Sequence, residues 1–244
     1  MEDRNLEEYR KRKKEAKQRF TAKQNLPYEV KVEKAALRVR EFITEMDKRY
    51  CNAHVSVGGL DSITLLLFIR KLGYDIPAIS VSGVEDKSVQ AVHKQLGVTR
   101  LRSYKSKVEV LNTNGFPVIS KRIAGKIDLL QHPTENNKTV RNAIITGECG
   151  AQGHFATNSR MQLPRKWLQL FAGMANEEYG THYQTAPFQV SNKCCYYLKE
   201  KPCDDWAKEH NSWPFLGMMA SEGGQREEAL VEHGCNYYGK TTMR

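Results

Sequence analysis

The residues best suited to bind an anion form a short glycine turn in the first third of the chain. Gly58 and Gly59 follow the short expected strand Ala53–Val57 and precede Asp61 and Ser62. A Gly-Gly turn between a buried strand and a helix directs backbone N–H groups and a helix N-terminus at one point, which is a site for phosphate or sulfate. The Ser62 hydroxyl is a further donor. The alternative is a tight turn in which Asp61 or Ser62 only caps the helix.

A second glycine pair, Gly223 and Gly224, stands between an expected strand and an expected helix near the end of the chain. If that strand is parallel to the first one, both loops lie at the sheet edge where open α/β sheets bind ligands. Arg226 would then clamp phosphate or sulfate, and Glu222 would orient Arg226 or bind a ribose hydroxyl. Ser82, at the end of another expected strand, joins these candidate nucleotide-binding residues. The alternative is that Arg226 only starts an exposed helix.

Six cysteines in 244 residues are too few for a disulfide scaffold, so in a reducing compartment they are free thiols or ligands. Cys194 and Cys195 are adjacent, and on a helix they would lie about 100° apart. This spacing excludes an ordinary local disulfide between them but lets both thiols reach one cluster. His54 and His93 fall within expected secondary structure and are predicted to be packing residues rather than ligands.

The periodicity of the apolar residues predicts the elements that must position these groups. The expected strands are Ala53–Val57, Ile76–Ser82, a third near Val98–Tyr104, and Pro214–Ala220. The expected helices are Glu2–Lys23, Val30–Tyr50, Ile63–Leu72, Asp86–Leu96, Cys194–Glu209 and Gly224–His233, with a mainly helical stretch from Ser106 to Tyr179. Strands separated by helices of this length predict an α/β fold with a doubly wound, mainly parallel, Rossmann-like sheet covered on both faces. We expect a charged helical extension over residues 1–50 and a nucleotide-binding domain over residues 51–244.

Composition restricts the class of protein further. With 40% hydrophobic residues the chain can bury a core, and no apolar run approaches the roughly 18 residues of a membrane span. The N-terminal region is charged and lacks the apolar segment of a secretory signal, which predicts a cytoplasmic protein. The net charge of +10 attracts phosphate-rich partners. The run Arg10–Lys14 is consistent with either a solvated helical appendage or a nucleic-acid-binding arm.

The glycine turn and two later segments together resemble a known family. Val57-Gly58-Gly59-Leu60-Asp61-Ser62 is similar to the PP-loop Ser-Gly-Gly-Lys-Asp-Ser of the adenine nucleotide alpha-hydrolase-like superfamily. Lys193-Cys194-Cys195 with Lys201-Pro202, followed by the Gly-x-x-Ala-x-Glu segment 217–222, resembles later motifs of bacterial and phage-type members of the phosphoadenosine phosphosulfate (PAPS) reductase-like family. The resemblance covers roughly residues 51–238. It departs from the motif at Val57 and Leu60, where a hydroxyl and a cation are expected.

The resemblance implies a site and its cofactors. It gives Asp61 and Ser62 the catalytic positions and places ATP, PAPS or adenylyl sulfate (APS) across the two glycine loops, with Mg²⁺ beside the phosphates. Some branches of the resembled family bind an iron–sulfur cluster, which implies Cys194, Cys195, Cys203 and Cys235 as ligands here. The alternative is that these cysteines are metal-free thiols.

Three functions follow as hypotheses. The first is an adenine-nucleotide-binding PAPS reductase-like enzyme that reduces an activated sulfate with a thiol reductant or cleaves ATP at the alpha phosphate. The second is a nucleic-acid sulfur-transfer or modification enzyme, which the basic N-terminal helix favours. The third is a non-catalytic nucleotide sensor or interaction protein, which Leu60 favours. The chain is also expected to be shorter at its C-terminus than members of the resembled family.

Overall fold

The structure is a computed structural model that describes residues 2–148, 161–171, 175–176, 181–182, 188–219, 221 and 223–238. The chain divides into two compact units. The first unit comprises Met1–Arg102 and Cys203–Arg244, and the second comprises Ser103–Pro202. The predicted boundary at residue 50 stays a prediction.

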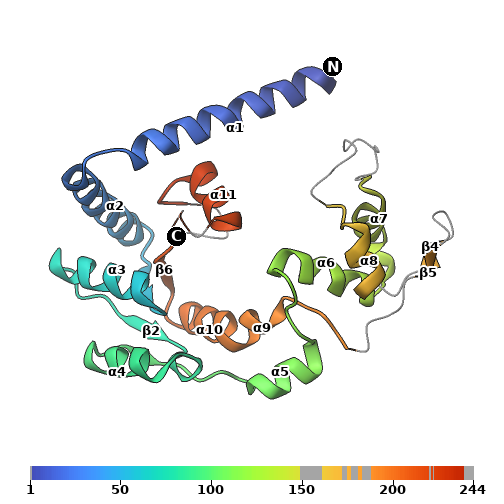
Figure 1. The fold of residues 1–244 in the computed structure, drawn as a ribbon. Helices are drawn as coiled ribbons and strands as arrows, with labels where there is room; N and C mark the ends of the chain where they lie inside the picture. Colours follow the sequence, from blue (N-terminus) through green and yellow to red (C-terminus); the bar gives the residue numbers. More distant parts are fainter. Residues whose placement is uncertain are drawn as a thin grey trace. The chain divides into compact units, whose positions relative to one another are not determined.

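The first unit is built around a parallel sheet (Figure 1). Its strands are β1 (Asn52–Ser56), β2 (Ala78–Ser80), β3 (Thr99–Arg100) and β6 (Ser212–Leu216), in the spatial order β3-β2-β1-β6. Its helices are α1 (Glu2–Gln24), α2 (Tyr28–Lys48), α3 (Leu60–Lys71), α4 (Lys87–Gln95), α10 (Lys201–Glu209) and α11 (Gly224–His233), with a 3-10 turn η1 (Ser82–Val84). All three strand pairs are parallel, which confirms the predicted α/β fold.

Apolar side chains alternate along the strands and bury one face of this sheet. Val55 pairs in register with Ala78 on one side and with Phe215 on the other, and all three face the same core. Phe42 and Met46 of α2 join that core, together with apolar residues of α3. His54 lies on the other face, against Trp206 of α10, so helices cover both faces as predicted.

The order of the strands places β1 at a reversal of the chain's direction across the sheet. From β1 the chain moves outward through β2 to β3, and β6 then returns to the opposite side of β1. In open parallel sheets the carboxyl edge at such a reversal is the usual ligand-binding position. The residues that follow β1 and β6 therefore lie at the edge where such sheets usually bind ligands.

Several predicted boundaries are wrong, for local reasons. The expected strand Pro214–Ala220 is β6, Ser212–Leu216, and it stops where Gly217 meets the first turn of α3. The expected strand through Ser82 ends at Ser80, and Ser82 begins η1 instead.

The expected helix over residues 194–209 is also interrupted. It consists of α9 (Lys193–Cys195), a π-helical turn (Tyr196–Glu200) and α10. Pro202 has no backbone N–H and its ring excludes a regular bond to the preceding turn, which accounts for the irregular winding before it.

The second unit is mainly helical, as predicted for this part of the chain. Its elements are α5 (Lys107–Asn114), α6 (Lys121–Gln131), the 3-10 turn η2 (Glu135–Asn137), α7 (Lys138–Thr146), α8 (Arg165–Phe171), the antiparallel pair β4 (Ala175–Asn176) and β5 (Thr181–His182), and α9. Ser106 and Ser120 accept backbone N–H groups at the starts of α5 and α6. Ile127 and Ile144 are fully buried in its separate core.

Candidate functional site

The first glycine loop is ordered by its own hydrogen bonds. The Gly58 N–H donates to Ser62 Oγ at 2.8 Å, and the Ser62 hydroxyl donates to the Gly59 carbonyl at 2.9 Å. Ser62 is only 7% exposed, so these bonds are sheltered from water. Its hydroxyl thus has a role in shaping the loop, and a contact from Ser62 to a ligand stays a prediction.

A histidine from outside the loop holds it from the other side. His93 on α4 is buried, and its Nε2 lies 2.8 Å from the Gly58 carbonyl oxygen. Because a carbonyl only accepts hydrogen bonds, Nε2 carries the proton. His93 is therefore buried and hydrogen-bonded as predicted, but it also positions the loop that the sequence singled out.

The start of α3 leaves backbone donors at this loop. The helix begins at Leu60 rather than at the expected Ile63, so the alternative in which Asp61 or Ser62 caps it is wrong, and both residues lie in its first turn. The N-cap residue is Gly59, and no side chain caps it. The N–H groups of a helix's first turn have no intrahelical partner and carry a partial positive charge. They form an electropositive point at the carboxyl edge of β1.

The space beside Gly59, the N-cap residue of α3, is open. A Cβ built on Gly59 meets no heavy atom within 4 Å, whereas one built on Gly58 lies 3.9 Å from Ser62 Oγ and 4.0 Å from Glu85 Oε1. The Gly59 backbone has φ −84° and ψ −160°, which other residues also adopt. The openness at Gly59 is thus a property of the surface and not of a strained backbone.

The segment after β6 packs directly onto this turn. Ser56 and Leu216 are paired in parallel register, so β1 and β6 end at the same edge, which meets the condition that the sequence analysis set for a joint site. A Cβ built on Gly217 would lie 2.6 Å from the Ser62 nitrogen and 2.9 Å from the Asp61 carbonyl carbon. Only glycine permits this approach, which joins the beginning of the second loop to the first.

The structure describes most, but not all, of the second loop. Gly223 and Gly224 have positive φ values of 68° and 59° at the start of α11, which glycine adopts without strain. Arg226 is exposed in the first turn of α11, and its approach to a ligand stays a prediction. Glu222 lies outside the described residues. Ser82 is buried at the start of η1.

Two charged residues that the sequence analysis missed lie near the carboxyl ends of β2 and β3. Glu85, directly after η1, brings a carboxylate oxygen close to Gly58. Arg100, at the end of β3, places Nη2 2.9 Å from a Cβ built on Gly83. The sequence carried a signal for both, because polar residues after successive parallel strands share one edge. The edge therefore has both an anionic and a cationic group.

The two departures from the PP-loop motif are visible in the structure. Val57 is buried, and its N–H extends the sheet by donating to the Ile79 carbonyl at 2.8 Å. Leu60 is 76% exposed at the start of α3. An apolar side chain thus stands in water where the resembled motif has a cation.

The four cysteines predicted as ligands form no disulfide bonds in the structure. Cys194 and Cys195 are half-buried in the second unit, while Cys203 and Cys235 belong to the first. Burial raises the pKa of the Cys194 thiol, and so does Cys195, against the lowering effect of nearby lysines. Within the described part of the chain, no three His, Cys, Asp or Glu side chains come together as a metal site would require. Ligation by these cysteines stays a prediction.

A buried histidine cluster lies on the α10 face of the sheet. His54 is 1% exposed, its Nδ1 lies 2.8 Å from Ser212 Oγ, and its ring packs edge-on against Trp206 at 5.2 Å. Trp206 stacks on His210 in turn, with ring centroids 4.0 Å apart. Burial lowers the pKa of His54 to about 4, and the charge of His210 adds to the effect. His54 is therefore a neutral packing residue, as predicted.

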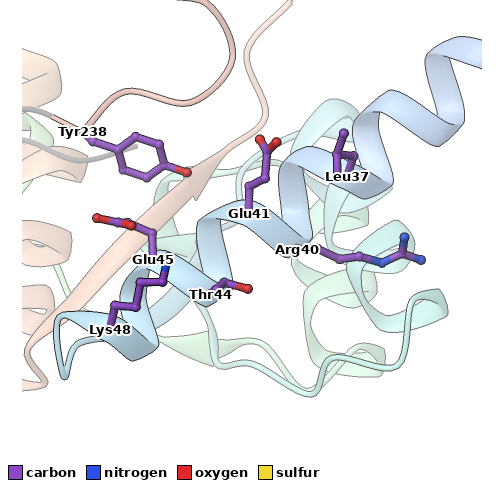
Figure 2. A pocket seen from close by; sticks show the side chains of 7 residues that line it. All are labelled: Leu37, Arg40, Glu41, Thr44, Glu45, Lys48 and Tyr238. Atoms are coloured by element: carbon purple, nitrogen blue, oxygen red, sulfur yellow. The ribbon is translucent and has the colours of Figure 1, made fainter.

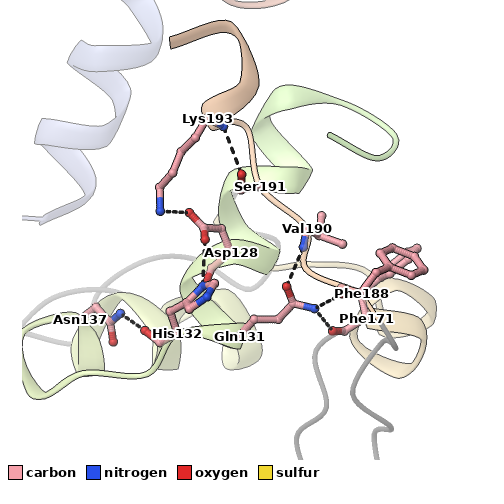
Figure 3. A network of polar contacts seen from close by, with 9 residues as sticks. All are labelled: Asp128, Gln131, His132, Asn137, Phe171, Phe188, Val190, Ser191 and Lys193. Atoms are coloured by element: carbon pink, nitrogen blue, oxygen red, sulfur yellow. Dashed lines mark hydrogen bonds and ion pairs between the residues drawn. The ribbon is translucent and has the colours of Figure 1, made fainter. Parts of the chain in front are cut away.

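In the second unit, a buried carboxylate holds the segment that carries the cysteine pair (Figure 3). Asp128 lies 3.0 Å from Lys193 Nζ through one oxygen and 2.9 Å from His132 Nδ1 through the other. Gln131 bonds the Phe171 and Phe188 carbonyls and accepts the Val190 N–H. The network attaches the start of α9 to α6, so Lys193 has a structural role beside Cys194.

A surface hollow of about 430 Å³ lies on the outer side of α2 (Figure 2). It is lined by Leu37, Arg40, Glu41, Thr44, Glu45, Lys48 and Tyr238. Tyr238 reaches it because the Asn236 amide donates to Tyr238 Oη at 3.1 Å and to the Arg38 carbonyl at 3.0 Å. Its cations and carboxylates balance, so it selects neither a phosphate nor a metal ion.

Comparison of the chain with protein-family models finds no match, and comparisons with curated proteins and with solved structures find none either. The likeness to the PAPS reductase-like family therefore stays a proposal that rests on the loop motifs. Among the helices that the structure describes, none combines the length and apolarity needed to cross a lipid bilayer.

Proposed function

We propose that the first glycine loop binds the phosphate or sulfate groups of an adenine nucleotide, in the manner of the PAPS reductase-like proteins that the chain resembles. One observation carries the proposal: the start of α3 has no side-chain cap, and the space beside its N-cap residue Gly59 is open. Backbone N–H groups at a helix N-terminus are well suited to tetrahedral oxyanions. His93 and Ser62 hold the loop in this conformation, so little ordering is needed when a ligand binds.

The charges around the loop fit a nucleotide phosphate with a cation. Arg100 near η1 attracts an anion, whereas the Glu85 carboxylate near Gly58 would repel an unaccompanied one. Mg²⁺ is commonly held by one or two carboxylates and by the substrate's phosphates. In this proposal Asp61 and Glu85 hold Mg²⁺, which neutralises phosphate charge when bound.

The reaction class depends on the ligand. PAPS or adenylyl sulfate would indicate thiol-dependent sulfate reduction, and Mg·ATP would indicate cleavage at the alpha phosphate. A nucleotide sensor without turnover is the second candidate, and the exposed Leu60 favours it because the motif's cation is missing beside the phosphates. Binding with no turnover of any of the three nucleotides would support the sensor.

The proposal is tested by isothermal titration with ATP, adenylyl sulfate and PAPS, each with and without Mg²⁺. We expect one of them to bind the unmodified chain. Gly59→Val should weaken that binding at least tenfold, because the added side chain enters the open space while the backbone conformation suits valine. Thr64→Val is the matched control, since Thr64 is exposed further along the same helix. Equal affinities of the Gly59 variant and the control, or no binding by the unmodified chain, would contradict the proposal.

A further inference from the structure

The positive charge of the chain is concentrated in one part of α1. From residue 10 to residue 24 there are eight Lys or Arg residues and one Glu, a net charge of +7 within a chain whose total is +10. The eight are Arg10, Lys11, Arg12, Lys13, Lys14, Lys17, Arg19 and Lys23. All eight are exposed. Arg19 forms a long ion pair with Glu15, at 3.9 Å.

On the surface of α1, seven of these eight cations lie in two stripes along the helix. With about 100° between successive residues, Arg10, Lys13, Lys14 and Lys17 fall on one side of α1. Arg12, Arg19 and Lys23 form a second stripe, roughly 150° from the first around the Phe20 side of the helix and roughly 210° around the opposite side. Lys11, Gln18, Ala22 and Glu15 lie on the crest between the stripes, on the side away from Phe20. The crest therefore carries one cation and one carboxylate, and Glu15 is paired with Arg19 of the second stripe.

The opposite side of α1 faces the rest of the first unit. Ala16 and Phe20 are half-buried, and α1 contacts α11 (Figure 1). Packing on that side accounts for the few apolar residues of α1. The crest with its two stripes remains exposed.

We propose that α1 binds double-stranded DNA by lying in the major groove, with one cationic stripe facing each of the two bordering phosphate strands. A helix with its side chains is about 10–12 Å across, and the major groove of B-form DNA is about 12 Å wide. Two stripes on opposite flanks of a polar crest match a groove bordered by phosphates on both sides. The inference goes beyond the proposed nucleotide site and uses none of its residues.

Other polyanions fit this surface less well. The major groove of duplex RNA is deep and too narrow to be read by side chains, so a helix with two cationic flanks does not fit it. An interfacial membrane helix needs a broad apolar face to insert, whereas the exposed crest of α1 carries Lys11 and Gln18. Since the contacts are mainly to phosphates, the binding should depend little on base sequence and strongly on salt.

The test is fluorescence anisotropy with a labelled 20-base-pair DNA duplex and the full chain. If about six cations contact phosphates, the logarithm of the association constant should fall with the logarithm of salt concentration with a slope of about −5. Between 50 and 200 mM salt this is a loss of roughly 1,000-fold.

Two triple variants with the same net charge make the test specific to α1. The first, Arg10→Gln, Lys14→Gln and Lys17→Gln, removes cations from one stripe and keeps good helix formers. The second, Lys34→Gln, Lys48→Gln and Lys71→Gln, removes three exposed cations from α2 and α3. The stripe variant should bind on the order of 100-fold more weakly at 100 mM salt and reduce the slope by about 2 to 3. The control should lose far less.

The proposal is wrong if the two variants bind DNA equally, or if the unmodified chain binds no duplex DNA. It is also wrong if a duplex RNA of the same length, or vesicles containing anionic phospholipid, bind at least as tightly as the DNA. The two proposals fail independently, because the stripe variant should keep its nucleotide affinity and Gly59→Val should keep its DNA affinity.

Discussion

Gly217 gives the sharpest prediction about how the two loops are joined. A Cβ at this position would lie 2.6 Å from the Ser62 nitrogen and 2.7 Å from Ser62 Cα. An ordinary contact begins near 3.4 Å, so in Gly217→Ala the backbone of the first turn of α3 must move by 0.8 Å. The obstructing atoms are backbone, and no side chain can rotate to make room.

Overpacking of this kind costs typically 1–3 kcal/mol. For a chain of this size that corresponds to a fall in melting temperature of roughly 2–12 °C. Because the displaced atoms include a first-turn N–H of α3, nucleotide affinity should also fall, by about tenfold or more. Gly59→Ala is the matched control for stability alone, since its Cβ meets nothing within 4 Å.

The assay is thermal unfolding of both alanine variants, followed by titration with the nucleotide that the unmodified chain binds. Gly217→Ala should melt below Gly59→Ala and should bind the nucleotide more weakly than the unmodified chain does. If Gly217→Ala matches the unmodified chain in both melting temperature and affinity, the close approach of the two loops does not exist and the argument for a joint site is refuted.

Three further predictions follow from single contacts. Because the pKa of His54 is about 4 in the folded chain and 6.5 is its ordinary value, the unfolded chain binds the proton more readily, and stability should fall as pH drops from 6.5 toward 4. Between pH 7 and pH 4.5 the loss attributable to His54 is about 2.5 kcal/mol, and urea unfolding of His54→Gln should lack it. Leu60→Lys restores the motif's cation at an exposed position and should tighten nucleotide binding on the order of tenfold by titration, unless the phosphates lie elsewhere. Asp128→Asn breaks the pair with Lys193 and should cost about 1–2 kcal/mol in urea unfolding, whereas Glu200→Gln, in an exposed pair, should cost under about 0.5 kcal/mol; equal losses would count against the buried network.

Local signals in the sequence predicted much of the framework. The strand, the glycine turn and the following helix were predicted because apolar periodicity and glycine act over a few residues. The same holds for α11, which spans Gly224–His233 as expected. The parallel sheet was predicted from the alternation of strands and helices, whereas the pairing of β1 with β6 was not predicted.

What the sequence did not predict depends on contacts between distant segments. The prediction that Gly217 belongs to a strand was wrong. The apolar run of the segment continues past Leu216 and so predicted a longer strand. In the structure the first turn of α3 packs against Gly217 and ends the strand at Leu216. The hydrogen bond of His93 to Gly58 joins residues 35 positions apart, and no local pattern indicates it. Glu85 could have been found, because it follows a predicted strand at the edge where both loops were expected.

The most direct test of the nucleotide site is a titration of the ¹⁵N-labelled chain, followed by the backbone amide signals of Gly59, Leu60 and Asp61. If the uncapped start of α3 receives a phosphate or sulfate, these amides should shift most and should saturate together with the affinity found by calorimetry. The His93 ring, through its bond to Gly58, should shift less. Saturable nucleotide binding that leaves these three amides unmoved, with the largest shifts on other elements, would contradict the proposed site.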